Sequence, residues 1–401
     1  MKDDQYQDSL ECVAKNIIKG FSIGFGTRLV LYPILKQKQQ QQSPLAFIFA
    51  DSIQYGTSLA SLLAIYNGIS YTFNYKYIHF LAGLVSGFVS IQQLPNAEIR
   101  RTATVFLFVR ACECVAQWMV KHQRFPSIYH ADTLLMCMSS GWMVHLWQNH
   151  PGALEQGYER FLSKQGQLPM PLIYASAHAQ AGLPLDLPLV NAARRAVYPT
   201  VQDLVGALDY DSPLLTSAEK AGILIHPGMS WNRFTLTLFK KGLWNAAPIY
   251  VFIHTVYSCL FGWKRLIKTP MDTLRFTALS IIRSTLFLST YCSLGISSFS
   301  LGRRMGIRFD RVGRMANVLP FLTGFTSGLS TFLEIKSRRV ELALYVSAKV
   351  VEGGLRLSGW TKVDSILFAV SLGVMSHMRS THPNCLRESH RKCMGYFFPS
   401  P

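Results

Sequence analysis

Long stretches without a charged residue are the feature that most limits how this chain can fold. Gly242–Trp263, Ser284–Leu301 and Met315–Leu333 contain no Asp, Glu, Lys or Arg. A helix needs about 20 mainly apolar residues to cross the hydrocarbon core of a bilayer. The pattern therefore predicts membrane-spanning helices. The alternative is a large soluble protein with helices that are apolar on all sides because they are buried.

Composition and charge favour the membrane interpretation. Charged residues make up 15% of the 401 residues, against about 25% in a typical soluble domain. The net charge is +18, and the basic residues flank the apolar runs without an aromatic-basic nucleic-acid motif. Positive charge in this position meets lipid phosphates and biases orientation. We expect membrane lipids as partners and no nucleic acid.

The chain contains an internal repeat. With a shift of 232 positions, Asp132–Leu154 matches Asp364–Leu386 at nine of 23 positions without a gap. With a shift of 241, the sequence FLAGLVSG of Phe80–Gly87 falls on FLTGFTSG of Phe321–Gly328. Self-similarity at a nearly constant offset is the signature of a duplicated structural unit.

Each copy contains about five apolar segments. They lie near residues 17–35, 45–70, 77–97, 102–120 and 131–147, and again near 243–262, 274–300, 315–333, 340–357 and 364–378. The last segment of each copy is short, so it either crosses the membrane or lies at its surface. The predicted fold is all-α: a polytopic membrane helical bundle of two tandem repeats with four to five membrane segments each.

This organisation predicts four parts. They are a first membrane repeat over 12–150, a proline-rich connector with short helices over 151–228, a second membrane repeat over 229–381, and a basic tail containing cysteine and histidine over 382–401. Orientation and oligomeric state do not follow from the sequence, because the basic clusters do not agree on one side of the membrane.

Glycines recur at four-residue spacing at the same place in both copies, as Gly83 with Gly87 and Gly324 with Gly328. This spacing puts both glycines on one helix face, where a neighbouring membrane helix can approach closely. We predict helix packing at these positions. The alternative is the ordinary abundance of glycine in membrane helices.

Each copy also carries a basic residue three positions before a glutamate within an apolar segment. Arg110 and Glu113 correspond to Lys349 and Glu352 after a shift of 239. Residues three apart share a helix face, so each pair can form an ion pair. The pairs either line a polar path for a substrate or ion, or join helices structurally.

The tail sequence places His382, Cys385, His390 and Cys393 at a spacing that resembles a zinc knuckle. Arg387, Arg391 and Lys392 lie among these residues and would repel a cation. We predict no metal and no other cofactor. Because no nucleophile, phosphate-binding or metalloprotease motif is present, we also predict no catalytic residue and no enzymatic activity.

Several stretches resemble the transmembrane protein 135 family. They are FLAGLVSG, Pro126–Asp132 (PSIYHAD), the histidine-proline stretch at His226, and Glu334–Arg339 leading into LALY. The resemblance covers most of the chain outside the connector. It implies a peroxisomal or mitochondrial membrane protein linked to lipid handling and organelle dynamics, with other organelle membrane proteins as further partners. The family is distantly similar to the four-helix inner-membrane protein-import family, so the alternative function is a protein-translocase-like membrane subunit.

Overall fold

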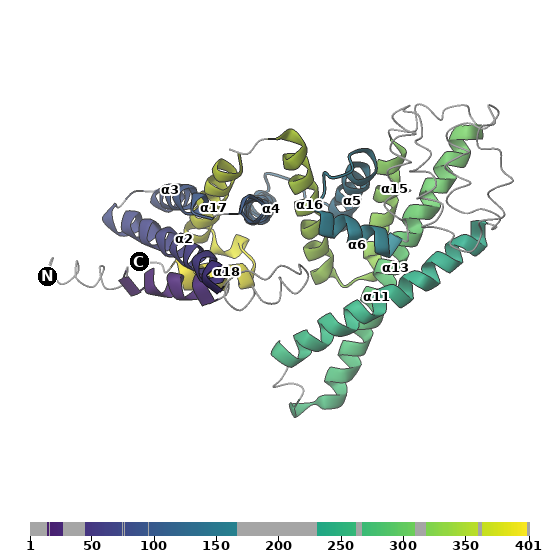
Figure 1. Cartoon of the computed structure of the whole chain (residues 1–401), viewed down its shortest axis with the longest axis horizontal. Helices are drawn as coiled ribbons and strands as arrows, with labels where there is room; N and C mark the ends of the chain where they lie inside the picture. The colour runs from purple at the N-terminus through teal and green to yellow at the C-terminus, as the bar shows by residue number, and fades with distance from the viewer. Residues whose placement is uncertain are drawn as a thin grey trace. The chain divides into compact units, whose positions relative to one another are not determined.

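The computed structural model describes residues 14–26 except 16, 45–166 except 74, 76 and 95, 231–261, 267–308, 318–359 and 363–398. Every regular element in these ranges is a helix, so the all-α prediction is confirmed. The helices are α2 (Leu45–Thr72), α3 (Ile78–Gln92), α4 (Ala97–Lys121), α5 (Ala131–Asn149), α6 (Gln156–Gly166), α11 (Trp231–Phe261), α13 (Pro270–Arg308), α15 (Leu319–Gly328), η1 (Leu329–Leu333), α16 (Lys336–Ser358), α17 (Val363–Thr381), η2 (Pro383–Cys385) and α18 (Glu388–Phe397) (Figure 1).

The helices form two compact units that are interleaved along the sequence. Unit 1 combines Met1–Ile128 with Ser358–Pro401, and unit 2 consists of Tyr129–Leu357. The last long helix of each predicted copy therefore lies in the unit formed mainly by the other copy: α5 in unit 2 and α17 in unit 1. The predicted sequence boundaries, 12–150 and 229–381, do not coincide with these units.

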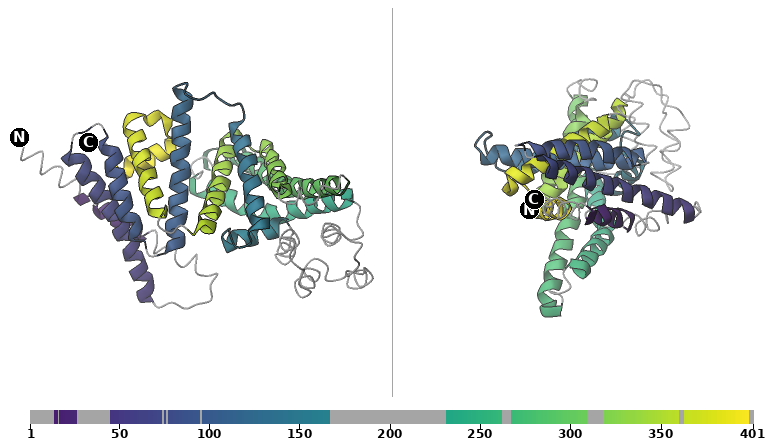
Figure 2. Two further views of the ribbon diagram at one scale, coloured as in Figure 1. Left: turned by 90° about the horizontal axis from the view of Figure 1, so that it is seen from above. Right: turned by 90° about the vertical axis from the view of Figure 1, so that its left-hand side faces the viewer.

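In unit 1, α17 packs against both α3 and α4, and α2 packs against α3 (Figures 1 and 2). Tyr66 and Leu63 of α2 lie in the same apolar core as Leu372 of α17 and Phe398, which follows α18. The aromatic rings of Tyr66 and Phe398 have their centroids 4.4 Å apart. Phe398, the last residue that the structure describes, is therefore part of the core of unit 1.

In unit 2, α15 packs against α5 and α13, and α13 also packs along α11. Its core contains Met136 and Met143 of α5, Tyr158 of α6, Phe287 of α13 and Ala343 of α16. The hydroxyl of Tyr158 donates to the sulfur of Met143 over 3.0 Å. Burial raises the pKa of Tyr158.

In α3 and α15 the middle of the buried face consists of small residues, while large apolar side chains on the opposite face are exposed. The buried face of α3 includes Ala82, Gly83, Ser86, Gly87 and Ser90. Its exposed face carries Leu81, Val85, Phe88 and Val89. In unit 2, α15 buries Thr323, Gly324, Ser327 and Gly328, while Leu322 is exposed. This is the reverse of a helix in a water-soluble protein, which turns its large apolar side chains inward.

By length and composition, two of the described helices are able to cross a membrane: Ala97–Lys121, and Pro270–Phe299 within α13. Ile17–Gly26 and Ile78–Gln92 are apolar but shorter. Four to five membrane segments in each copy therefore remains a prediction.

The glycine pairs lie where helices approach most closely. A Cβ atom added to Gly83 would lie 2.9 Å from the Cα of Gly373 and from the carbonyl oxygen of Leu372. A Cβ on Gly87 would lie 3.1 Å from the Cα of Ala369. Real Cβ atoms almost never approach backbone this closely, so α3 and α17 of unit 1 cross at a distance that only glycine allows.

Unit 2 has the same crossing between α15 and α5. A Cβ on Gly324 would meet the carbonyl oxygen of Ser140 and lie 2.9 Å from the Cα of Gly141, and one on Gly328 would lie 2.5 Å from the Cα of Cys137. Ser140, Gly141 and Cys137 are the residues that a shift of 232 places on Leu372, Gly373 and Ala369. The corresponding residues of the two copies thus touch corresponding neighbours.

We expect Gly83→Ala to lower the free energy of unfolding by about 1–3 kcal/mol, because the new methyl group must displace backbone and not a flexible side chain. Gly68→Ala in α2 is the matched control, since no atom lies within 4 Å of its added Cβ. There the better helix propensity of alanine should stabilise by up to about 1 kcal/mol. Denaturant unfolding of the purified full chain in detergent measures both. Equal effects of the two substitutions would contradict a packing role for Gly83.

Candidate functional site

The last long helix of each predicted copy, α5 and α17, ends at a histidine-proline step with the same geometry. The amide of His150 donates to the carbonyl of Leu146 over 2.9 Å, and that of Ala153 donates to His150 over 3.0 Å. The amide of His382 donates to Met378 over 2.8 Å, and that of Cys385 to His382 over 2.9 Å. The three residues of the second set, Met378, His382 and Cys385, lie 232 positions after those of the first. Since proline disfavours a helical residue before it, each step ends its helix and reverses the chain.

The equivalence continues past this turn. α6 begins at Gln156 and α18 at Glu388, again 232 positions apart. Ala153 and Cys385 occupy the same place before these helices, and each is 2% exposed. The similarity of the copies therefore extends beyond residue 150 and into the predicted tail, whose described residues, 382–398, are largely helical and belong to unit 1.

The four candidate metal ligands of the tail are not gathered around one point. Cys385 lies in the core of unit 1 and Cys393 is exposed. The ring of His382 faces the rings of His122 and Trp118, with centroid distances of 5.1 and 5.9 Å. Within the described part of the chain, no three His, Cys, Asp or Glu side chains are grouped to hold a metal ion. Cys385 occupies the position of an alanine, as a small buried apolar residue.

The predicted pair Arg110 and Glu113 forms the centre of a buried charge cluster in unit 1. Nη1 of Arg110 lies 2.9 Å from Oε2 of Glu113. Nε of Arg387, from the turn before α18, donates to Oε1 of the same carboxylate over 2.5 Å. Nε2 of Gln117 donates to Oε1 over 3.3 Å. Glu113 thus joins α4 to the end of the chain.

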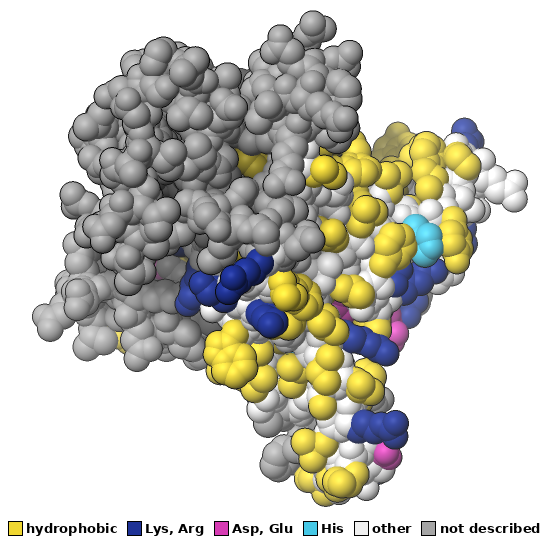
Figure 3. All heavy atoms as spheres, turned by 90° about the vertical axis from the view of Figure 1, so that its right-hand side faces the viewer, with side chains coloured by type: hydrophobic (Ala, Val, Ile, Leu, Met, Phe, Trp, Pro, Cys, Tyr) yellow, Lys and Arg dark blue, Asp and Glu magenta, His cyan; other side chains and the backbone are white. Residues whose placement is uncertain are grey.

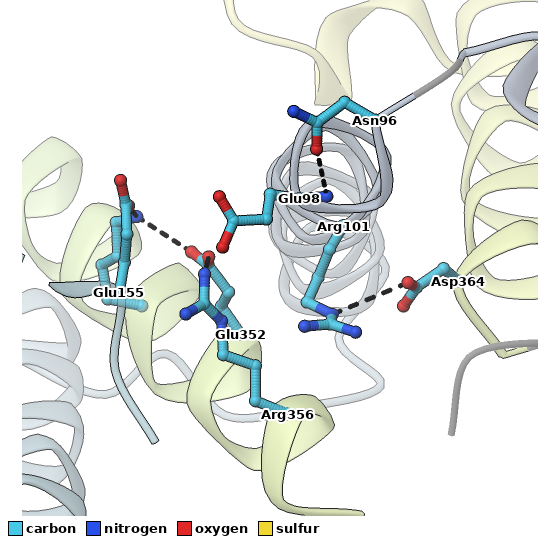
Figure 4. Close-up of polar contacts among 8 residues, drawn as sticks. Asn96, Glu98, Arg101, Glu155, Glu352, Arg356 and Asp364 are labelled. Atoms are coloured by element: carbon cyan, nitrogen blue, oxygen red, sulfur yellow. Dashed lines mark hydrogen bonds and ion pairs between the residues drawn. The ribbon is translucent and has the colours of Figure 1, made fainter. Parts of the chain in front are cut away.

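Lys349 and Glu352 form the corresponding cluster in unit 2. Nζ of Lys349 lies 2.9 Å from Oε2 of Glu352 and 2.9 Å from Oε2 of Glu155, in the turn before α6. Nη2 of Arg356 donates to Oε1 of Glu352 over 3.0 Å. Figure 4 shows Glu155, Glu352 and Arg356 in this arrangement.

The two clusters use corresponding positions with one reversal of charge. Glu155 and Arg387 are 232 positions apart and hold opposite charges, while Glu113 and Glu352 are equivalent. In unit 1 a single carboxylate holds two guanidinium groups, and in unit 2 a single ammonium group holds two carboxylates. Buried charges are tolerated when they are paired in this way. The contacts favour the structural interpretation of these pairs over a substrate path.

Further basic residues hold helix ends in both units. Nη1 of Arg100 donates to the carbonyl of Leu94 over 3.1 Å, and Nε of Arg339 donates to that of Glu334 over 2.8 Å. Cations at these carbonyls satisfy acceptors left open where a helix ends. In unit 1, Arg101 also lies 3.6 Å from Asp364 at the start of α17 (Figure 4).

A third polar cluster was not predicted from the sequence. It lies in unit 2 and consists of His254 of α11, Ser284 of α13, Glu334 after η1 and Arg338 of α16. Oγ of Ser284 donates to Oε1 of Glu334 over 2.6 Å and accepts from Nη1 of Arg338 over 2.7 Å. His254, Ser284 and Glu334 are buried. The available signals were a histidine inside an uncharged run and a glutamate directly after another.

The guanidinium group of Arg338 lies between the two ends of this cluster. Its Nη1 is 3.9 Å from Oε1 of Glu334. Its Nη1 and Nη2 lie 3.2 and 3.3 Å from the two ring nitrogens of His254. Unlike the clusters around Glu113 and Glu352, this cluster combines an imidazole, a hydroxyl, a carboxylate and a guanidinium group. Its groups can bind a proton or an anion.

Comparison of the chain with protein-family models, with curated proteins and with solved structures gives no match.

We expect Lys349→Glu to destabilise the protein by about 3 kcal/mol or more, because it replaces the cation between Glu155 and the buried Glu352 by a third carboxylate, and Arg356 is then the one cation left on Glu352 among the contacts described. Adding Glu155→Lys should recover part of the loss, since the charges of the cluster are then restored in exchanged positions. Unfolding midpoints and folded yield of the full chain measure this. The matched control is Lys392→Glu, because Lys392 and its partner Glu388 are both mostly exposed and should show no measurable change. Additive losses in the double variant would argue against pairing.

Proposed function

We propose that the chain is a non-enzymatic integral membrane protein whose helices turn large apolar side chains toward lipid. One observation carries this proposal: the buried faces of α3 and α15 are centred on glycine with serine or threonine, while α3 exposes Leu81, Val85, Phe88 and Val89 and α15 exposes Leu322. Membrane helices associate through small residues because lipid is as apolar as the protein core. A water-soluble protein with these exposed faces would present large apolar patches to solvent.

The long helices of unit 2 support the same proposal. Trp244 and Phe252 of α11 and Phe276 of α13 are 83%, 70% and 68% exposed. Figure 3 shows hydrophobic side chains, with Lys and Arg among them, over much of the described surface on this side. Apolar side chains accompanied by cations suit a bilayer with phosphate groups at its surface.

We further propose that the chain arose by duplication and that each copy contributes its last helices to the other unit. The matching glycine crossings, histidine-proline turns and charge clusters support this. In this interpretation, α5 and α6 of the first copy complete the bundle of unit 2, and α17 and α18 of the second copy complete the bundle of unit 1.

The resemblance to the transmembrane protein 135 family supports a place in the peroxisomal or mitochondrial membrane and a function in handling lipids or other hydrophobic metabolites. The glycine-lined crossings of α3 with α17 and of α15 with α5 favour a second candidate. In that case the protein is a translocase-like subunit that uses closely packed helices.

Membrane residence predicts that Val85→Lys sharply lowers the amount of folded, membrane-integrated protein. A charge facing lipid costs about 3 kcal/mol, whereas on a water-exposed helix face the same change is nearly neutral. Tyr129→Lys is the control, because Tyr129 is 87% exposed and lies between α4 and α5. Resistance to alkaline carbonate extraction is the measurement. If both variants behave like the unsubstituted chain, the outward face of α3 does not lie in lipid.

The two functions differ in what contacts the protein in the membrane. If it handles lipid, a photoactivatable phospholipid or fatty-acid probe should crosslink to the full chain in organelle membranes, in competition with unlabelled lipid. An arrested precursor protein carrying the same photoactivatable group should then give only background. Competed crosslinking to the precursor instead would support the translocase-like candidate.

A further inference from the structure

The polar cluster of His254, Ser284, Glu334 and Arg338 joins two long helices to the segment between η1 and α16. Ser284 stands at the centre of the candidate membrane span Pro270–Phe299. Buried ionisable groups beside such a span are costly, and where they occur they commonly mark a binding site or a path for ions or protons. Glu334 is 4% exposed and His254 is 5% exposed. The cluster opens at Arg338, whose side chain is 36% exposed.

The fold does not require charge at this place. A shift of 241 puts Glu334 on Gln93 of the first copy. In unit 1, Oγ of Ser61 donates to Oε1 of Gln93 over 3.2 Å, as Ser284 donates to Glu334. A hydroxyl thus meets a side-chain oxygen in both units, but only unit 2 places a carboxylate there. An uncharged amide satisfies the same structural position.

Arg338 has more donors here than the cluster can accept. Two of its nitrogens face the two ring nitrogens of His254. A neutral imidazole accepts a hydrogen bond at one nitrogen only, and an arginine has no acceptor to offer the other. One guanidinium donor therefore has no acceptor on this ring. A planar guanidinium group suits carboxylate, phosphate and sulfonate oxygens.

An anion alone would meet repulsion from Glu334. The described groups that interact with that carboxylate are His254 and Tyr250 of α11, Ser284 of α13, and Arg338 of α16. Cys292 of α13 interacts electrostatically with Tyr250. Arg339 donates to the backbone carbonyl of Glu334. Glu334 and Arg338 cancel in charge. An added anion makes the buried cluster negative unless a proton enters with it. A proton bound to Glu334 neutralises that carboxylate and so removes its repulsion of the anion.

We propose that this cluster binds the anionic head group of an amphipathic ligand at Arg338 together with one proton on Glu334. This inference rests on the proposed membrane function and names the class of ligand. Phe332 and Leu333, directly before Glu334, are 47% and 44% exposed. These two side chains adjoin the cluster along the chain and provide an apolar surface for the hydrocarbon tail.

The test uses the full chain in phosphatidylcholine nanodiscs and measures saturable binding above that of empty nanodiscs. Decanesulfonate is the probe, because its head group stays charged and any pH dependence then belongs to the protein. Methanesulfonate lacks the tail and decanol lacks the charge. We expect decanesulfonate to bind most tightly, with its affinity rising as the pH is lowered, by up to about tenfold per pH unit because one proton is bound together with the anion.

Glu334→Gln should tighten decanesulfonate binding and remove its pH dependence, an effect opposite to that of a merely damaged site. Glu334→Gln combined with Arg338→Gln keeps the cluster neutral and should abolish saturable binding. Arg283→Gln controls for general attraction by an exposed cation of α13 and should bind normally.

Unchanged pH dependence in Glu334→Gln, or equal binding of decanol and decanesulfonate, would overturn the proposal. So would normal binding in the doubly substituted chain, or no saturable binding by the unsubstituted chain. The proposed membrane function is judged separately by carbonate extraction and Val85→Lys, so the failure of one can be distinguished from failure of the other.

Discussion

Close approach of helix backbones at glycine is the contact on which both units depend. Gly83 lies against Gly373 in unit 1, and Gly324 lies against Gly141 in unit 2. Glycine carries no side chain, so two helices can meet almost backbone to backbone and gain dispersion contacts along their length. This contact directs the large apolar side chains of α3 and α15 outward. The same crossings place α17 and α5, and with them the turns and short helices that follow.

The charge clusters secure those turns. Glu113 binds Arg387 and Lys349 binds Glu155, so the turn after α17 is held by a residue of α4 and the turn after α5 by a residue of α16. The residue in the turn is basic in unit 1 and acidic in unit 2, but it occupies the same position. An ion pair at this position is common to both units, and either arrangement of charge supplies it. The cluster around Glu334 is different, because its counterpart in unit 1 is uncharged.

Much of this arrangement was accessible from the sequence. The helical spacing predicted that Arg110 pairs with Glu113 and Lys349 with Glu352, since residues three apart on a helix are neighbours whatever surrounds them. It did not predict Arg387 or Glu155 as further partners, because those residues come from distant turns. The cysteines of the tail suggested metal ligands by spacing alone, whereas burial places Cys385 in a core position that an alanine fills in unit 2.

The sequence by itself determined the local features: helices, uncharged runs, glycines on one face, and two related copies. Periodicity records which residues share a helix face, and that depends only on neighbours along the chain. Only the tertiary structure decided that α5 packs on α15 and α17 on α3. Because α5 and α17 carry glycine at corresponding positions, Gly141 and Gly373, the sequence pattern alone does not assign each helix to its partner. The gathering of His254, Ser284, Glu334 and Arg338 from separate elements likewise depends on how those helices pack.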